Sequence, residues 1–368
     1  MLAVGEAVAL HRLLALVSMA VSAACARNSF SPRGRSLDWG GQITVAVALF
    51  GLMFAVIQGP TAGWSSAEVI IGFVVAVVFL VLFVMAENRA AAPLLNLDLF
   101  RNRAFTIASI ASVIGMFCFL GTAYSTSIRL TAILLFTPLH AAIAFVLFNG
   151  IALPLIPVTE RLLHTYNPRW TMGAGLALMA AGDLWTATVP VTSQVGLGPV
   201  IAPYVLIGIG FALAVSALTA VIVDTVPHHL EGMASASANM LRDFGFTLGP
   251  AVVGAVALSN AAAAIHAKVA STPALAHSVA AFNASAAHNP ALKEAAGAVS
   301  SGPLGANSVP DPPNPLKHVA FDALGHANAI GYVVCGLAGL VAALLVVLAL
   351  GGGTHQPMIA ERSLSEQD

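Results

Sequence analysis

The run VIIGFVVAVVFLVLFVMA, residues 69–86, holds 18 consecutive residues without a charge. A helix needs about 20 mainly apolar residues to cross the hydrocarbon core of a bilayer. Inside lipid the backbone must satisfy its own hydrogen bonds, and the run shows no short alternation of polar and apolar residues, so it predicts a membrane-spanning helix. Seven other runs have the same character. The eight predicted spans lie at residues 40–60, 68–86, 104–126, 138–158, 171–190, 198–223, 233–258 and 323–349.

The overall composition agrees with this interpretation. Of the 368 residues, 58% are hydrophobic and only 8% are charged, whereas a soluble domain has about a quarter of its residues charged. A chain this apolar needs the lipid bilayer as solvent for much of its surface. The formal net charge of −1 argues against nucleic acid as a partner, which would favour a basic surface. The predicted fold class is all-α, a polytopic transmembrane helical bundle.

Residues 7–25 form a weaker candidate span. Glu6, His11 and Arg12 lie at or inside this apolar run, and Arg27 follows it. The segment is compatible with a poor span, an interfacial helix or a signal-like sequence. Residues 1–33 are therefore an N-terminal segment without an assigned structure.

The arginines of the short loops predict the orientation in the membrane, because cytoplasmic loops carry an excess of Lys and Arg. The loops 61–67 and 191–197 contain neither residue type, and Arg129 is the exception on that side. We therefore expect a multi-pass protein of the cell (plasma) membrane whose C-terminal tail, residues 350–368, is cytoplasmic. The other segments expected on the cytoplasmic side are 26–39, 87–103, 159–170 and 224–232.

Two segments outside the spans have a character of their own. Residues 87–103 combine several leucines with charges at both ends, which predicts an amphipathic connector at the cytoplasmic interface. Residues 259–322 form a long outer loop that is rich in alanine. Its first part is compatible with helix, whereas the proline-rich part from residue 300 to 315 predicts extended or disordered chain.

Several short motifs resemble one family of membrane transporters. They begin at the first hairpin and continue into the span 233–258. The motifs are GRSLDWGG at 34–41, IQGP at 57–60, GW at 63–64, PLL at 93–95, DLFRNR at 98–103, and Pro227, Gly232, 234–236 (ASA), Asn239, Arg242, Gly245, Gly249 and Gly254. Together they are similar to the fourteen-helix drug:proton antiporters of the major facilitator superfamily, the EmrB/QacA type, in which such a hairpin joins two six-helix bundles.

The resemblance implies a domain arrangement. Residues 34–86 would be the linker with its transmembrane hairpin, and residues 104–349 the second six-helix bundle, divided three and three around Pro190. The first six helices of the family have no counterpart ahead of Arg35. We therefore expect a truncated transporter that would need the missing N-terminal half, or a homodimer, to complete its pathway.

The resemblance also implies a function. In the complete parent protein this would be proton-coupled efflux of small lipophilic or drug-like molecules by alternating access, with protons and the substrate as partners and no cofactor. The alternative is a non-transporting membrane fragment that acts as a structural or regulatory partner of other membrane chains. An enzyme is disfavoured, because no phosphate-binding loop, G-x-S-x-G motif or metal-ligand spacing occurs in the sequence.

Asp183 is the first candidate for proton coupling or substrate binding. A charge at the centre of a transmembrane helix costs roughly 2.5–3.5 kcal/mol on insertion scales, so it needs a reason. Its neighbours at helical spacing are small or weakly polar, which suits a face turned toward other helices. Both a proton-exchanging carboxylate and a structural carboxylate bonded to a neighbouring helix fit this position.

Three further polar residues are candidates for the same role. Arg242 belongs to a small and polar stripe of the span 233–258, Arg129 lies just past the span 104–126, and Asn149 lies within the span 138–158. Each has a structural alternative: Arg242 can pair with Asp224, Arg129 with a carboxylate, and Asn149 can form a hydrogen bond between helices.

Two more groups have expected roles outside the substrate site. Residues 159–170 resemble the cytoplasmic gating loop of the family, with Glu160, Arg161 and Arg169 as its charges, although His164 stands where an aspartate is usual. Gly residues of the span 233–258 predict close helix packing, because glycines spaced by three residues let a neighbouring backbone approach. These are Gly245, Gly249 and Gly254.

Overall fold

The computed structural model describes residues 12–13, 15–23, 38–90, 95, 97–191, 196–224, 231–311 and 314–350. The chain divides into two compact units, Met1–Asp38 and Trp39–Asp368. In the first unit residues 15–23 are helical. They belong to the weak candidate span 7–25, of which residues 7–11, 14, 24 and 25 lie outside the described residues.

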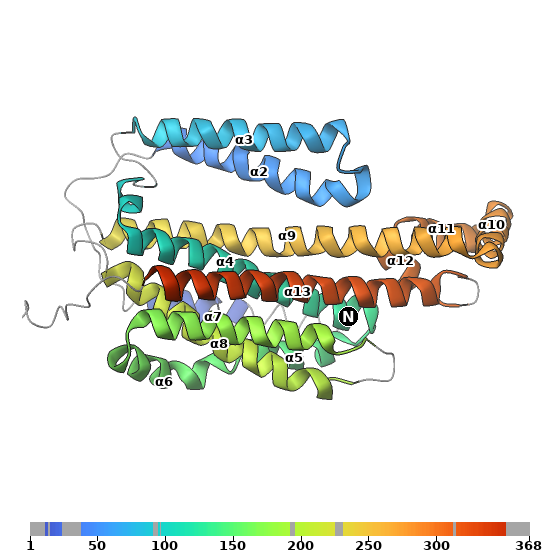
Figure 1. Ribbon diagram of the computed structural model, residues 1–368. Coiled ribbons are helices and arrows are strands. Elements are labelled where there is room, and N and C mark those ends of the chain that lie inside the picture. The colour runs from blue at the N-terminus through green and yellow to red at the C-terminus, as the bar shows by residue number, and fades with distance from the viewer. Residues whose placement is uncertain are drawn as a thin grey trace, which may run out of the picture. The chain divides into compact units, whose positions relative to one another are not determined.

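The predicted hairpin is present as helices α2 (Trp39–Ala62) and α3 (Ala67–Glu87), which lie side by side in Figure 1. Gly51 and Gly72 face each other across this pair, and a side chain built on either glycine would approach the other helix to about 2.9 Å. Ser66 starts α3 because its hydroxyl accepts a hydrogen bond from the Val69 amide at 3.4 Å. Most other large side chains of α3 are exposed, as expected for a helix in lipid.

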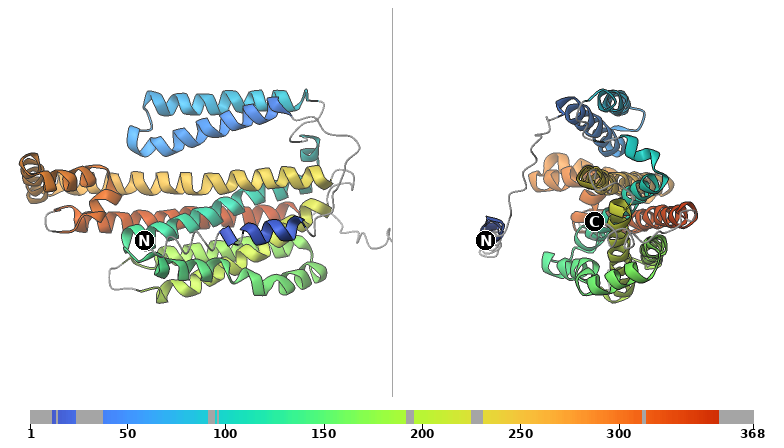
Figure 2. Two further views of the ribbon diagram at one scale, coloured as in Figure 1. Left: turned by 180° about the vertical axis from the view of Figure 1, so that it is seen from behind. Right: turned by 90° about the vertical axis from the view of Figure 1, so that its left-hand side faces the viewer.

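The bundle that follows is formed by long helices that run alongside one another (Figures 1 and 2). α13 (Lys317–Ala349) packs against α4 (Arg103–Ser127), α7 (Pro168–Thr188) and α9 (Glu231–Ser271), and α7 packs against α8 (Gly198–Asp224). The predicted span 138–158 is divided into α5 (Pro138–Asn149) and α6 (Ala152–Thr165). The predicted polytopic all-α bundle is confirmed.

Seven helical segments of the described chain are long and apolar enough to cross a membrane, one fewer than the eight predicted spans. The difference is the predicted span 171–190, which forms α7. This helix has 21 residues and lies in the bundle, but Asp183 and several glycines lower its hydropathy. Its burial among other helices compensates for the lower apolar content.

The segment 259–322, which the sequence predicts as an outer loop, is helical over its first part, as its sequence allows, and departs from the prediction only in its proline-rich part. α9 continues through 41 residues to Ser271, about 60 Å at 1.5 Å per residue, which exceeds the hydrocarbon core of about 30 Å. Three helices follow: α10 (Pro273–His288), α11 (Pro290–Ser300) and α12 (Pro303–Ser308). Each begins with a proline, whose fixed φ angle suits the first helical position.

The expectation of extended or disordered chain over 300–315 is therefore wrong for α12. This helix packs on an outer cluster of apolar side chains, and the fully buried Asn307 within it donates hydrogen bonds to the carbonyls of Ala132 (2.8 Å) and Ile133 (3.3 Å). Composition indicated disorder because it does not report such tertiary contacts. The outer cluster consists of Ile133, Ala261, Ile265, Ala306, Ala320, Ala323, Leu324 and Ala327.

The amphipathic connector is described at residues 87–90, at residue 95 and from residue 97 onward. A short 3-10 helix, η1 (Leu97–Arg101), lies there with Leu99 buried. Asp98 and Arg101 form an exposed ion pair at 3.8 Å. The short helix η1 thus has an apolar side with Leu99 and a charged side with Asp98 and Arg101.

Candidate functional site

Asp183 lies in the C-terminal part of α7, before the helix ends at Thr188, and is fully buried. One oxygen of its carboxylate accepts a hydrogen bond of 2.6 Å from the hydroxyl of Thr122 on α4. The other oxygen, Oδ2, is buried and has no hydrogen-bond partner among the described residues. No described Lys, Arg or His lies within the 4.0 Å of an ion pair from this carboxylate.

Small residues of α7 place this carboxylate in the interior. Gly175 and Gly182 let α8 approach so closely that a side chain at Gly175 would lie 2.6 Å from the Ala214 nitrogen, and one at Gly182 would lie 2.8 Å from the Pro203 carbonyl. The side chains expected to share the face of Asp183 are inside as well, since Met179, Ala180 and Thr186 are all buried. The polar side chain is therefore fixed between helices rather than in lipid.

A row of hydroxyl groups occupies the same interior. The hydroxyl of Thr126, one helical turn beyond Thr122 on α4, lies 2.9 Å from the Tyr332 hydroxyl on α13. Tyr332 in turn lies 3.2 Å from the hydroxyl of Tyr204 on α8. Both tyrosines are fully buried. Sequence reasoning missed this group, and the only local signal was the i, i+4, i+7 spacing of Thr122, Thr126 and Arg129.

Arg129 is 3% exposed and lies in a π-helical turn, η2 (Ile128–Ile133), that continues α4. Its guanidinium donates hydrogen bonds to the carbonyls of Val189 (3.1 Å) and Pro190 (3.3 Å) at the end of α7. A cation at a helix C-terminus is favourable, because the last carbonyls lack partners within the helix and carry partial negative charge. The structure thus places Arg129 as the cap of α7.

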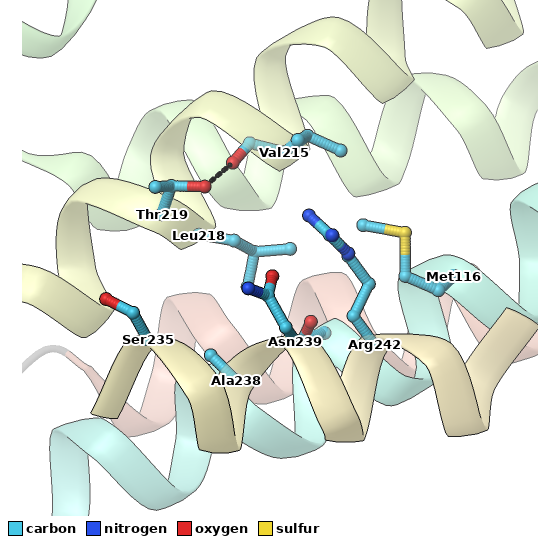
Figure 3. A pocket seen from close by; sticks show the side chains of 9 residues that line it. Met116, Val215, Leu218, Thr219, Ser235, Ala238, Asn239 and Arg242 are labelled. Carbon is cyan, nitrogen blue, oxygen red and sulfur yellow. Dashed lines mark hydrogen bonds between the residues drawn. The ribbon is translucent and has the colours of Figure 1, made fainter. Parts of the chain in front are cut away.

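Arg242 lies apart from these residues, in a pocket between α4, α8 and α9. Figure 3 shows its guanidinium and the Asn239 amide rising from α9 toward α8. The pocket has a volume of about 150 Å³. It is lined by Ser112, Met116, Val215, Leu218, Thr219, Ser235, Ala238, Asn239 and Arg242.

The remaining candidates do not join either site. Asn149 is exposed and donates a hydrogen bond of 3.1 Å to the Phe145 carbonyl of its own helix. Glu160 and Arg161 are exposed on α6, and Arg169 lies 4.9 Å from the Trp170 ring. No ion pair within 4.0 Å joins these three charges in the described structure.

The three glycines of α9 lie where α4 comes closest. A side chain at Gly249 would lie 2.5 Å from the Phe117 carbonyl, and one at Gly245 would collide with the Val113 carbonyl. At Gly254 the nearest atoms belong to the Tyr124 ring, 3.0 Å away. The close approach of the α4 backbone at Gly245 and Gly249 explains why α4 and α9 pack along their length.

Metal binding finds no support in the described part of the chain, where no group of three His, Cys, Asp or Glu side chains is placed to hold an ion. The described residues do not include 225–230, which contain His228 and His229. The side chains of the two flanking acidic residues, Asp224 and Glu231, are not described either.

Comparison with known proteins identifies relatives. The profile described as Major Facilitator Superfamily matches residues 7–250. The "Multidrug resistance protein Stp" of Mycobacterium tuberculosis is 31% identical over 232 residues, which cover 62% of this chain and 42% of that protein. The "Tetracenomycin C resistance and export protein" of Streptomyces glaucescens is 27% identical over 248 residues, 67% of this chain and 45% of that protein. The chain thus spans less than half the length of these two relatives.

Proposed function

The chain belongs to the major facilitator superfamily of membrane transport proteins, which are not enzymes, and we propose that it serves the efflux of lipophilic, drug-like molecules driven by protons. The names of its relatives, which refer to multidrug resistance and to resistance and export, support this proposal. The substrate would cross by alternating access, in which two helical bundles rock about a site between them. The hairpin α2–α3 and the connector motifs favour the fourteen-helix type within the superfamily.

Asp183 is the observation that carries the proton-coupling part of the proposal. A carboxylate inside a transmembrane bundle is expensive and marks a functional site by default. This one is fully buried, has no described cation within ion-pair distance, and uses one oxygen for a single hydrogen bond from Thr122. Such a group can take up a proton in one conformation of the bundle and release it in another, when its access to water changes.

We propose that the bundle from α4 to α13 works opposite a second six-helix bundle. That second bundle would come from further chain of a longer transporter or from a second copy of this chain. The shared segment of less than half of each relative supports this arrangement. In the plasma membrane, the loop 159–170 and the C-terminal tail would face the cytoplasm.

A chimera tests the proposal. In it the aligned segment of the mycobacterial Stp protein is replaced by the corresponding residues of this chain, and the product is reconstituted in vesicles. We expect efflux of a lipophilic dye that depends on a proton gradient, and no efflux from vesicles that hold this chain alone.

Each arm of this experiment can contradict part of the proposal. Efflux by this chain alone, without a crosslinked dimer, would refute the need for a second bundle. A folded and inserted chimera that does not transport would refute the transport role and favour a structural partner of other membrane chains.

A further inference from the structure

Among the described residues, the pocket around Arg242 contains a cation without an anion. Arg242 is partly buried, and its Nε atom is buried without a hydrogen-bond partner among the described residues. No described carboxylate lies within the 4.0 Å of an ion pair from it. The adjacent acidic residue in the sequence, Asp243, is exposed and does not line the pocket.

The other polar groups among the described lining residues are neutral. Ser112, Ser235 and Asn239 present hydroxyl and amide groups, and the Thr219 hydroxyl already donates to the Val215 carbonyl at 3.0 Å. A guanidinium offers five N–H donors and no acceptor. The described lining of the pocket is therefore rich in donors and positively charged, so it suits a negatively charged or acceptor-bearing group and disfavours a cation.

The size of the pocket limits what can enter it. A cavity of about 150 Å³ lined by apolar side chains accepts one benzene-sized ring, and the pocket measures about 150 Å³. Met116, Leu218 and Ala238 supply apolar walls beside the polar groups. One ring that carries an acidic substituent thus fits both the volume and the lining.

We infer that this pocket binds the acidic end of lipophilic weak acids, namely an aromatic carboxylate or phenolate, with Arg242 as its counter-charge. The inference rests on the proposed efflux function and names the substrate class of that function. It assigns Arg242 and Asn239 to substrate recognition and separates them from Asp183, which faces the interior between α4 and α7.

Binding to the purified chain in neutral maltoside micelles tests the inference. Three probes share one benzene ring and differ only in its substituent: benzoate, the neutral benzamide and the cationic benzylamine, each titrated at pH 7 by calorimetry against empty micelles. Hydrogen bonds to a charged group contribute about 1.5–3 kcal/mol, so we expect the benzoate to bind at least about tenfold more tightly than the amide. The amine should bind most weakly.

Variants show which residue causes the preference for benzoate. Arg242→Gln should remove this preference, whereas Arg242→Lys should keep part of it because the charge remains. Arg161→Gln, at an exposed position of α6, should leave the preference unchanged. Asp224→Asn should also leave it unchanged. Equal binding of the three probes, or a preference that survives Arg242→Gln, would overturn the inference.

Two further outcomes are decisive. A tenfold gain in benzoate affinity in Asp224→Asn would show that Asp224 already neutralises Arg242, and it would also overturn the inference. Binding in micelles needs neither a second bundle nor a proton gradient. A transporting chimera without benzoate preference would therefore refute only the substrate class, and benzoate binding without transport would refute only the proposed function.

Discussion

The hydroxyl of Thr122 on α4 donates a hydrogen bond of 2.6 Å to the carboxylate of Asp183 on α7, and both side chains are fully buried. The bond connects two helices through residues that are 61 positions apart in the sequence. Because it occupies only one carboxylate oxygen, the second oxygen remains available for a proton. A change in the spacing of α4 and α7 would alter this bond directly.

Replacing Asp183 by asparagine should abolish proton coupling in the transporting chimera. Asparagine keeps an oxygen that accepts from Thr122 but cannot exchange a proton, so the fold and most substrate binding should persist. The measurement is substrate-induced proton release in detergent. Thr186→Val is the matched control, since Thr186 lies on the same buried face of α7 and its hydroxyl donates to the Gly182 carbonyl of its own helix. Equal proton release from Asp183→Asn and the parent chimera would remove Asp183 from the mechanism.

Replacing Arg129 by methionine should lower stability more than it lowers substrate binding. The change removes the two hydrogen bonds that the guanidinium donates to the carbonyls of Val189 and Pro190, and a hydrogen bond from a charged group contributes about 1.5–3 kcal/mol. Equilibrium unfolding followed by circular dichroism measures the loss. Arg101→Met, at the exposed pair with Asp98, should change stability little. Unchanged stability together with weaker substrate binding would instead place Arg129 in the substrate site.

Alanine at Gly245 or Gly249 should destabilise the bundle. The added methyl group would meet backbone atoms of α4, which cannot move aside as a flexible side chain can, and overpacking of this kind typically costs about 1–3 kcal/mol. Gly232 on the same helix is the matched control, because a side chain there would meet nothing within 4 Å. The same unfolding measurement applies. Equal stability of Gly249→Ala and Gly232→Ala would show that α4 and α9 do not pack as described.

Single cysteines should report the orientation in the membrane. Ser285 on α10 and His164 on α6 are both exposed, so burial does not prevent their modification. In a background without Cys25, Cys118 and Cys335, an impermeant maleimide added to intact cells should label Ser285→Cys and not His164→Cys. The opposite labelling pattern would reverse the orientation that the loop arginines predict.

Sequence alone determined the bundle of long helices, because a long apolar run without alternation of polar and apolar residues satisfies its backbone in lipid as a helix. It also located the hairpin, the small-residue face of α7 and the close-packing glycines of α9, which depend on residues spaced by three or four positions. These are local properties. Asp183, Arg129 and Arg242 were found as candidates because a charge in an apolar run is conspicuous at any position.

Only the tertiary structure decided what those charges contact. Thr122 lies 61 positions before Asp183, and Tyr332 lies 206 positions after Thr126, so no spacing rule links them. Arg129 caps α7 only because the end of α7 lies beside η2. α12 is helical although its composition predicted disorder, because Asn307 and the outer cluster stabilise it. Helix formation depends on neighbours along the chain, whereas hydrogen-bond partners and pockets depend on how helices pack, and that packing appears only once the whole chain is folded.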